Sequence, residues 1–221
     1  METALIIGAS GGIGAAVTRR LVEQGVSVTR LSRSEEGFDL TDPDGVMLKL
    51  DNLPGQFDLI LVASGALEIN GAVPEKTLRA ISASAMMDQF ALNAVGPALV
   101  LSRAYQLLPR HRRSVFAVLS ARLGSIGDNR IGGWISYRAA KAAVNQVVRT
   151  AAIELARTHK QAICVALHPG TVKTEFTNKY LGRHPAVEPE AAADNLLNVI
   201  RGLTLADTGG FYDWAGKPVP W

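Results

Sequence analysis

Short apolar runs that alternate with longer helix-like segments constrain the fold of this chain more than any other feature of its sequence. The runs are nearly continuous in Val, Ile, Leu and Ala, which is typical of parallel strands covered by helices on both faces. The alternation therefore predicts βαβ units around a parallel sheet, an α/β fold. The expected strands are Ala4–Ile7, Ser27–Ser32, Leu59–Ala63, Ser114–Ser120 and Ala162–His168, with a weaker one near Gly210–Asp213 and a brief one within Phe38–Pro43.

Four segments have the apolar spacing of amphipathic helices. No internal repeat, low-complexity tract or linker separates them, so a single domain over residues 1–221 is expected. The helices are expected from Ile13 to Gly25, over Ser84–Leu108, from about Ser136 to Thr158 and over Pro189–Leu203.

The composition is that of a globular protein with a large core. Apolar residues make up 48% of the chain and charged residues only 19%, which argues against a disordered chain. The formal net charge is +3, and the one compact group of basic residues is Arg110-His111-Arg112-Arg113. Because no basic stripe or recognition motif accompanies this group, a solvated helix end or loop is favoured over a nucleic-acid site.

The first residues and the single cysteine indicate the cellular compartment in which the protein is expected. Thr3-Ala4-Leu5-Ile6-Ile7 is strand-like and has no charged leader or cleavage site around it, which argues against secretion. No uninterrupted apolar run has the length of a membrane span. Cys164 lies between apolar residues, so a buried strand position is expected for it rather than a reactive thiol. A cytoplasmic protein with no membrane partner is the expectation.

A glycine-rich turn, Gly8-Ala9-Ser10-Gly11-Gly12-Ile13-Gly14, connects the first expected strand to the first expected helix. Glycines allow a tight bend and let the main chain approach a pyrophosphate with no Cβ in the way. The helix N-terminus then offers unpaired N–H groups and a partial positive charge to the anion. A tight strand–helix turn alone would also use glycines, but the position after the first strand of an alternating chain favours a dinucleotide site.

The end of the second expected strand, Leu31-Ser32-Arg33-Ser34, bears on the choice of dinucleotide. A site for NAD usually has a carboxylate here for the ribose hydroxyls, whereas an arginine pairs with the 2′-phosphate of NADP. No Asp or Glu stands at this strand tip and Arg33 is available, so NADP(H) is favoured over NAD(H). The alternative is a surface arginine without a ligand. Asp39 could accept a hydrogen bond from the adenine amino group.

Tyr137 and Lys141 are four residues apart, which places them one turn apart on one face of a helix. A free tyrosine has a pKa of about 10, too high for efficient proton transfer at neutral pH. A neighbouring ammonium stabilises the phenolate and lowers that pKa, so the tyrosine can exchange a proton with a carbonyl or alcohol oxygen. Such a pair also occurs by chance on helices, and its weight here comes from the glycine turn in the same chain.

Together these residues resemble the short-chain dehydrogenase/reductase family over nearly the whole chain. Gly8-x-x-x-Gly12-x-Gly14 is similar to the cofactor turn of the family, Asn93 to its active-site asparagine and Tyr137/Lys141 to its catalytic pair. Pro169-Gly170-Thr171-Val172-Lys173-Thr174 resembles the loop that borders the nicotinamide in the family. Further similarity, to the C-factor-like branch of carbonyl reductases, lies in Ser120–Ile126, Gly132-Gly133-Trp134 and the closing Gly216–Trp221.

The resemblance implies a fold, a reaction and a set of binding residues. The fold would be a single-domain Rossmann fold: a doubly wound, mostly parallel sheet in the order 3-2-1-4-5-6-7, with helices on both faces and the cofactor along the carboxyl ends of the strands. The reaction would be hydride transfer between the nicotinamide and a carbonyl or alcohol substrate, with Tyr137 as general acid/base. The residues expected at the cofactor are Gly8, Ser10, Gly11, Gly12, Ile13, Gly14, Arg33, Asp39, Leu40, Ala63, Ser64, Gly65, Tyr137, Lys141, Pro169, Gly170, Val172 and Thr174.

Asn93 has a physical rationale of its own. Pro97 has no N–H, and in an α-helix that N–H would bond the carbonyl oxygen of Asn93. The carbonyl is therefore left without this donor, and a kink is expected at this point of the helix. In the family this carbonyl holds a water molecule linked to the catalytic lysine. The alternative is an asparagine that caps a broken helix.

The sequence departs from the family pattern at two places. The catalytic serine of the family is the second of a Ser-Ser pair after the fifth strand, and here the pair is Ser120-Ala121. Because side chains alternate along a strand, Ser120 is expected to face away from the serine position, and Ser125 is a second candidate. Loss of one donor to an oxyanion costs about a hundredfold in rate without abolishing the chemistry. The other departure is Ala63-Ser64-Gly65 in place of Asn-Asn-Ala-Gly, and its small residues still let a cofactor approach.

Two other functions compete with a reductase. A cofactor-binding signalling or interaction protein is favoured by Ala121, but it would not need Asn93, Tyr137 and Lys141 together. An epimerase or dehydratase on the same fold is disfavoured because little chain remains for a substrate domain. No spacing of His, Cys and acidic residues suggests a metal site, and His168 is interpreted as a structural histidine rather than a general base.

The substrate lid of the family corresponds to residues about 175–188, and this segment is short, which favours an open pocket. The expected partner is a small carbonyl or alcohol compound, with no nucleic acid and no membrane. Relatives often pair through the helices that carry Asn93 and Tyr137. A homodimer, a homotetramer and a monomer all stay open.

Overall fold

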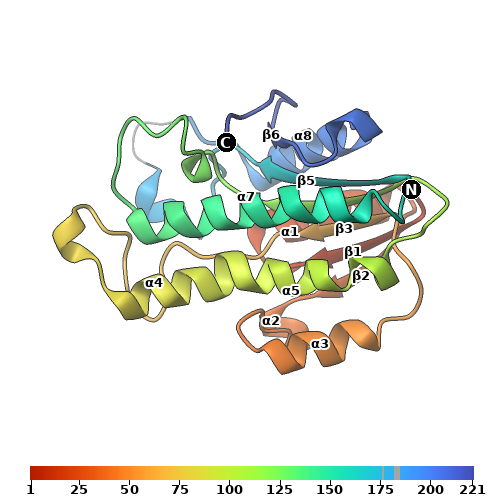
Figure 1. The fold of residues 1–221 in the computed structure, drawn as a ribbon, viewed down its shortest axis with the longest axis horizontal. Helices are drawn as coiled ribbons and strands as arrows, with labels where there is room; N and C mark the ends of the chain where they lie inside the picture. Colours follow the sequence, from red (N-terminus) through yellow and green to blue (C-terminus); the bar gives the residue numbers. More distant parts are fainter. Residues whose placement is uncertain (176, 182–184) are drawn as a thin grey trace.

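Six parallel strands form one sheet in the computed structural model, which describes residues 1–175, 177–181 and 185–221. Their order is β2-β1-β3-β4-β5-β6, so the direction of strand addition reverses at β1. Each strand expected from a continuous apolar run is present, as is the weaker one near residue 211 (Figure 1). The strands are β1 (Thr3–Ile7), β2 (Ser27–Leu31), β3 (Leu59–Val62), β4 (Ser114–Leu119), β5 (Ala162–His168) and β6 (Phe211–Asp213).

Helices cover both faces of the sheet and bury two separate apolar cores. Alternate residues of a strand enter different cores: Leu5 and Ile7 of β1 face one, and Ala4 and Ile6 face the other. The second core is closed by α1 and α8, and the first by α3, α5 and α7. The helices are α1 (Gly12–Glu23), α2 (Arg33–Glu36), α3 (Pro43–Asp51), α4 (Ala83–Phe90), α5 (Gly96–Ser102), α6 (Ala104–Leu107), α7 (Ile135–Leu155) and α8 (Pro189–Gly202).

The prediction of a brief strand within Phe38–Pro43 is wrong, because the described part of the chain has no strand there. The predicted order of seven strands is wrong for the same reason, since that strand would have been the outermost one. Ser32 caps α2 directly after β2, and Gly37 turns the chain at φ 65°. Asp42 then caps α3. The short stretch between these two helices is used to fill the core, since the side chains of Phe38 and Leu40 are buried there. The sheet therefore ends at β2.

The opposite edge of the sheet is covered by the end of the chain. The N–H of Asp213 in β6 donates to the carbonyl oxygen of Lys217, and the N–H of Val219 donates to that of Phe211. Tyr212 and Pro218 form an antiparallel bridge between these bonds. The last residues thus take up the outer hydrogen-bonding side of β6.

The long helix expected over Ser84–Leu108 is divided, and a π-helical turn lies just before Pro97, close to where a kink is expected. α4 ends at Phe90, a single π-helical turn spans Ala91–Val95, and α5 starts at Gly96. Gly96 donates its N–H to the carbonyl oxygen of Ala91, five residues earlier. Turns of this kind bulge a helix locally and are frequent at functional sites. Here the bulge carries Asn93, which is completely buried.

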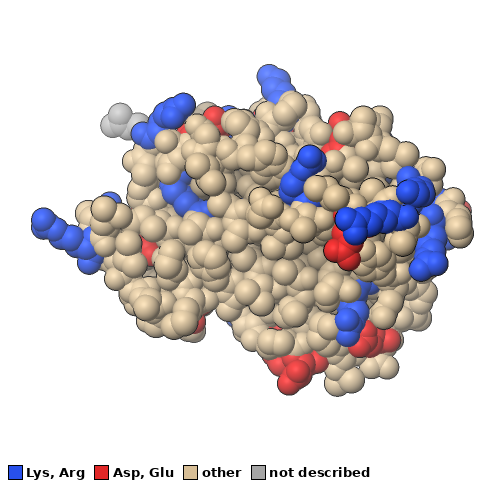
Figure 2. Space-filling model, in the orientation of Figure 1, with Lys and Arg blue, Asp and Glu red and all other residues tan. Residues whose placement is uncertain are grey.

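Charged side chains lie mostly toward the margins of the face shown in Figure 2, and the middle of that face is largely uncharged. Two members of the basic group noted in the sequence have structural partners. Arg112 pairs with Asp58 at 2.8 Å, and Arg113 donates to the carbonyl oxygens of Ile200 and Leu203. The basic group therefore holds distant segments of the chain together.

Across the described ranges, no helix is both long and apolar enough to cross a membrane.

Cys164 lies in β5 and is buried, as expected from its apolar neighbours. Burial raises the pKa of its thiol to about 12. Since only the thiolate is an effective nucleophile, this cysteine is chemically inert at neutral pH.

Candidate active site

The segments that follow the parallel strands meet along one edge of the sheet, where doubly wound folds bind their ligands. Gly8 follows β1, Ala63 follows β3, Ser120 follows β4 and Pro169 follows β5. The helix α7 brings Tyr137 and Lys141 to the same edge, since Lys141 Nζ donates to the carbonyl oxygen of Leu119 at 3.0 Å. The sequence motifs are therefore collected in one place.

The glycine turn is packed so closely that side chains would not fit at several positions. A Cβ on Gly14 would lie 2.1 Å from the carbonyl oxygen of Gly8, and a Cβ on Gly8 would lie 2.7 Å from Ser64 Oγ. Gly8 also has a φ of 84°, which favours glycine. Gly11 is the N-cap of α1 and supplies no side-chain acceptor to its first turn. The N–H groups that start α1 are thus left for a ligand, which fits a dinucleotide pyrophosphate.

The residues after β2 are at the surface beside this turn. Ser34 donates a hydrogen bond to Ser10 Oγ at 2.9 Å, which joins the start of α2 to the glycine turn. Arg33 is exposed. Hydrogen bonds from the backbone and hydroxyl of Thr41 hold the pKa of Asp39 below its usual range, and the charge of Arg33 adds to this effect. Asp39 is half-buried, whereas the side chain of Leu40 is buried in the core.

Tyr137 and Lys141 are both buried on one turn of α7, with 5% and 3% of their surfaces exposed. Lys141 Nζ lies 5.7 Å from the centroid of the Tyr137 ring. Burial lowers the pKa of Lys141 to about 8 and raises the pKa of Tyr137 above its usual value. The rise at Tyr137 is opposite to the lowering expected from the sequence, and its cause is desolvation by burial. At neutral pH the tyrosine is a phenol and can act as an acid.

Two hydrogen bonds from its side-chain amide fix the orientation of Asn93, which lies near Lys141. Its Nδ2 donates to the carbonyl oxygen of Ala66 at 3.1 Å and to Gln89 Oε1 at 2.8 Å. Its Oδ1 is buried and has no hydrogen-bond partner among the described residues. A Cβ on Gly65 would lie 2.8 Å from Asn93 Oδ1 and 3.5 Å from Lys141 Nζ, so both polar atoms face this glycine. Only a residue without a side chain leaves room for them there.

The two candidate serines are both buried. Ser120 Oγ has no hydrogen-bond partner in the part of the chain that is described. Ser125 Oγ accepts a hydrogen bond from the N–H of Asp128 at 3.0 Å. Ser120 is 4% exposed and Ser125 is 2% exposed, a burial similar to that of Tyr137 and Lys141.

The Pro-Gly loop after β5 approaches the glycine turn from the other side. A Cβ on Gly12 would lie 2.6 Å from Thr174 Cγ2, so these two segments nearly touch. Gly170 has a φ of 80° and lies under the Trp214 ring, while Val172 is buried and bridges to Val187. The expected lid, residues about 175–188, falls partly on 176 and 182–184, which lie outside the described residues.

Four residues at this edge were missed by the sequence analysis, because no local pattern marks them. Gln89 orients Asn93 from one turn earlier. Glu75 accepts hydrogen bonds from the start of α7, and Tyr180 contacts Trp134, which is the N-cap of that helix. Glu68 accepts from the Tyr180 hydroxyl at 2.7 Å. Their partners are 61 and 112 residues away in the chain for Glu75 and Glu68, so only the folded structure shows them.

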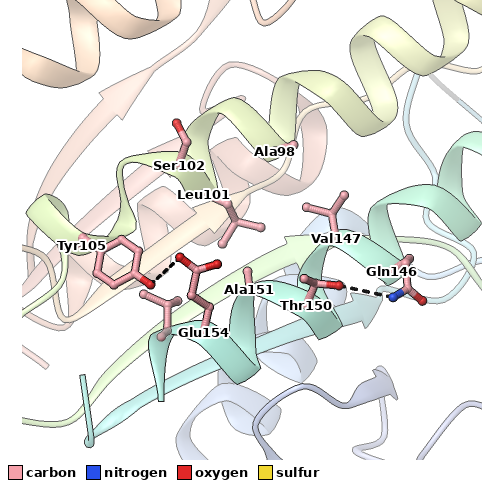
Figure 3. Close-up of a pocket in the computed structure, with 10 residues that line it drawn as sticks. Ala98, Leu101, Ser102, Tyr105, Gln146, Val147, Thr150, Ala151 and Glu154 are labelled. Atoms are coloured by element: carbon pink, nitrogen blue, oxygen red, sulfur yellow. Dashed lines mark hydrogen bonds between the residues drawn. The ribbon is translucent and has the colours of Figure 1, made fainter. Parts of the chain in front are cut away.

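A groove lies elsewhere, between α5 and α7 (Figure 3). Figure 3 shows Tyr105 and Glu154 at one end of it, joined by a hydrogen bond of 2.8 Å, and Gln146 and Thr150 at the other. Thr150 is thirteen residues beyond Tyr137, about 20 Å along the helix. The groove is therefore separate from the candidate active site.

Histidine and acidic side chains do not form a metal-binding cluster among residues 1–175, 177–181 and 185–221. His168 is largely buried at the end of β5, and burial together with the charge of Arg122 lowers its pKa to about 4. Its imidazole is therefore neutral at physiological pH.

The fold and this edge define a doubly wound α/β protein with a buried tyrosine–lysine pair at the carboxyl ends of its strands. The family model for short chain dehydrogenases matches residues 37–183, and the chain belongs to this family. The resemblance drawn from the sequence motifs is thereby confirmed.

Relatives and solved structures agree with this assignment. The chain is 27% identical to 1-hydroxy-2-glutathionyl-2-methyl-3-butene dehydrogenase of Rhodococcus sp. (strain AD45), over 100% of both chains. It is 35% identical to C-signal of Myxococcus xanthus, over 62% of this chain and 78% of that protein. A short-chain dehydrogenase/reductase from Burkholderia multivorans with bound NADP has a TM-score of 0.83 at 27% identity, covering 100% of this chain and 99% of that one. The carbonyl reductase Sniffer of D. melanogaster shares the fold, with a TM-score of 0.85 at 20% identity and full coverage of both chains.

Proposed function

We propose that this chain, as one domain over residues 1–221, is an NADP(H)-dependent oxidoreductase that interconverts a carbonyl compound and its alcohol. The observation that carries the proposal is the buried pair of Tyr137 and Lys141 at the same sheet edge as the glycine turn. A nucleotide-binding protein without catalysis would have no use for a buried acid next to a buried ammonium. The NADP bound by the Burkholderia multivorans relative supports the same cofactor here.

The residues present fit the cofactor. The crowded glycines of the turn and the uncapped start of α1 suit the pyrophosphate, and Arg33 suits a 2′-phosphate. When bound, the nicotinamide would supply a hydride to the carbonyl carbon or accept one from the alcohol. Gly65 leaves the space in front of Asn93 and Lys141 without a side chain.

Tyr137 is the general acid of the reduction in this proposal. Its phenol, kept protonated by burial, donates a proton to the carbonyl oxygen as that oxygen becomes an alcohol. Lys141 stabilises the phenolate that remains, because its ammonium lies on the same turn. Asn93 offers two acceptors on this side, its Oδ1 and the carbonyl that Pro97 cannot bond, and a water molecule held there would link to Lys141. Ser120 and Ser125 are both candidates for the hydroxyl that steadies the substrate oxygen, because Ala121 stands at the position of the family's serine.

A signalling function is the second candidate, and the 35% identity to C-signal is the observation that favours it. Ala121, where the family has its catalytic serine, points the same way. The two candidates differ in one property, which is turnover.

Removal of the Arg33 side chain tests the cofactor and the reaction together. The wild type is expected to oxidise NADPH faster than NADH when given a panel of aldehydes, ketones and quinones. In Arg33→Ala the Kd for NADPH should rise about tenfold or more, because a charge-assisted contact to the 2′-phosphate is lost, while the Kd for NADH stays the same. Fluorescence titration gives both constants.

The matched control is Arg30→Ala, which removes an exposed arginine from β2 that pairs with Glu35 at 3.6 Å. It should change neither constant. An equal loss of both cofactors in Arg33→Ala would contradict the assignment of Arg33. Absence of turnover with either cofactor across the panel would favour the signalling candidate.

The rate of reduction is expected to fall above about pH 8. The pKa of Lys141 is lowered from 10.5 to about 8, so its ammonium exists below that pH and is lost as the pH rises through it. Without the charge, the Tyr137 phenolate loses its stabilisation, and kcat/KM for reduction should drop about tenfold per pH unit. A pH–rate profile checks this, with the Kd for NADPH measured over the same range as the control. A flat profile up to pH 10 would show that Lys141 does not titrate in this way.

A further inference from the structure

Trp134 has a backbone conformation that its side chain disfavours. It lies at φ 52° and ψ 43°, in the left-handed region, at the N-cap of α7. Apart from Asn70, every other positive φ among the described residues belongs to a glycine. The two residues before it, Gly132 and Gly133, have φ values of 69° and 68°. A glycine at the third position would remove the strain, so the strain indicates that the indole itself has a use.

Glu75 holds this strained turn in place. Its carbonyl oxygen accepts the N–H of Trp134 at 2.5 Å, and its carboxylate accepts the N–H of Ser136 at 3.2 Å and the Ser136 hydroxyl. Burial alone would raise the pKa of Glu75, but these hydrogen bonds keep it below its usual range, so the carboxylate is charged. It therefore caps α7, which the tryptophan at the N-cap cannot do.

The indole of Trp134 is directed at the catalytic tyrosine and at the segment opposite it. Its ring is edge-on to Tyr137, with centroids 6.4 Å apart, and edge-on to Tyr180, with centroids 5.1 Å apart. Tyr180 belongs to the short helical turn Asn178–Tyr180, which lies beside the start of α7 at one end of the molecule (Figure 1). Trp134 thus connects the two segments that flank Tyr137.

The polar groups of the Asn178–Tyr180 turn are paired with Glu68. The hydroxyl of Tyr180 donates to Glu68 Oε1 at 2.7 Å, and Lys179 Nζ pairs with Glu68 Oε2 at 2.9 Å. The acid and the ammonium neutralise one another. This segment therefore brings an aromatic ring to Trp134, and its charges are paired.

We propose that Trp134 is a specificity-determining residue, whose indole forms with Tyr180 an aromatic wall that favours neutral aldehydes and ketones with an aromatic ring on the carbonyl carbon. The inference rests on the proposed function and deepens it. Aromatic rings prefer edge-to-face and offset contacts with one another over contacts with saturated groups of the same size. A flat ring on the substrate would place its carbonyl oxygen at Tyr137 while it contacts the indole.

The test compares two aldehydes of similar size, benzaldehyde and cyclohexanecarbaldehyde, in wild type, Trp134→Phe and Trp134→Gly. The ratio of their kcat/KM values should fall about tenfold in Trp134→Gly, mainly through the KM of benzaldehyde, and should be largely retained in Trp134→Phe. The thermal midpoint of Trp134→Gly should not fall, because glycine is favoured at φ 52°. Tyr105→Ala is the control and should leave the ratio unchanged. It removes an aromatic ring from α6, next to the far end of α7.

Binding is measured separately, by calorimetry of benzaldehyde with the protein–NADP⁺ complex. Its Kd should rise by the same factor in Trp134→Gly and not in Trp134→Phe. An unchanged ratio and an unchanged Kd in Trp134→Gly would overturn the inference, and so would equal losses for both aldehydes. If the wild type reduced neither aldehyde nor any compound of the panel, the proposed function would fail, whereas the calorimetric comparison would still decide whether Trp134 recognises the ring.

Discussion

Tyr137→Phe is expected to lower kcat for carbonyl reduction a hundredfold or more while the Kd for NADPH changes less than about twofold. A positioned general acid contributes about 10²–10⁴ to a rate, and the substitution removes only the hydroxyl that carries the proton. The phenyl ring keeps its place on α7, its edge contact with Trp134 and its position near Lys141. Steady-state NADPH consumption and a fluorescence titration of NADPH give the two quantities.

Tyr105→Phe is the matched control. It also removes one tyrosine hydroxyl, the one that donates to Glu154, at the far end of α7. Its kcat should stay within about threefold of the wild type. Should Tyr137→Phe turn over at a comparable rate, the proton must come from another group, and the proposed reaction would lose its acid.

Gly14→Ala is expected to lower the free energy of unfolding by about 3 kcal/mol and to abolish detectable binding of NADPH. The new Cβ would lie 2.1 Å from the carbonyl oxygen of Gly8 and 2.8 Å from its carbonyl carbon. Both atoms belong to the backbone, so the clash can only be relieved by moving the turn away from α1, and overpacking of this kind costs about 1–3 kcal/mol or more. Urea unfolding measures the loss of stability.

Gly202→Ala provides the comparison. Gly202 is the last residue of α8, and no atom lies within 4 Å of the position that its Cβ would take. Since alanine is favoured over glycine in a helix, this variant should be as stable as the wild type or slightly more stable. Equal stability of the two variants would show that the glycine turn tolerates a methyl group, and the argument from close packing would fail.

The fold could be predicted from the sequence wherever the signal is local and repeated. Apolar runs located five strands of the described sheet and a weaker pattern located the sixth, while the missing donor of Pro97 marked the region of the π-helical turn that carries Asn93. Such local signals could not distinguish a strand near Phe38 from an irregular stretch. Alternating apolar residues also suit an irregular stretch that fills a core, and here two helix caps leave no room for a ladder.

The candidate site was predictable only in part, for a physical reason. The glycine turn and the Tyr137/Lys141 spacing depend on neighbours in the chain, and they stand together at one edge as expected. Glu75 and Tyr180 reach α7 from distant segments, so no spacing could indicate them. The direction of the pKa shift at Tyr137 was also beyond the sequence, because burial decides it.

In the described part of the chain no strand lies outside β2, and this bears on how molecules of the protein meet at high concentration. An open sheet edge is a template for another chain, and ribbons of paired edges are a route to aggregation. On the β6 side, the last residues, with Pro218 and Pro220 among them, occupy the edge. On the other side β2 is only five residues long, and its Arg30 stands next to Glu35 and Glu36. We expect the short, charged edge strand on one side and the residues paired with β6 on the other to disfavour growth of the sheet by a second copy.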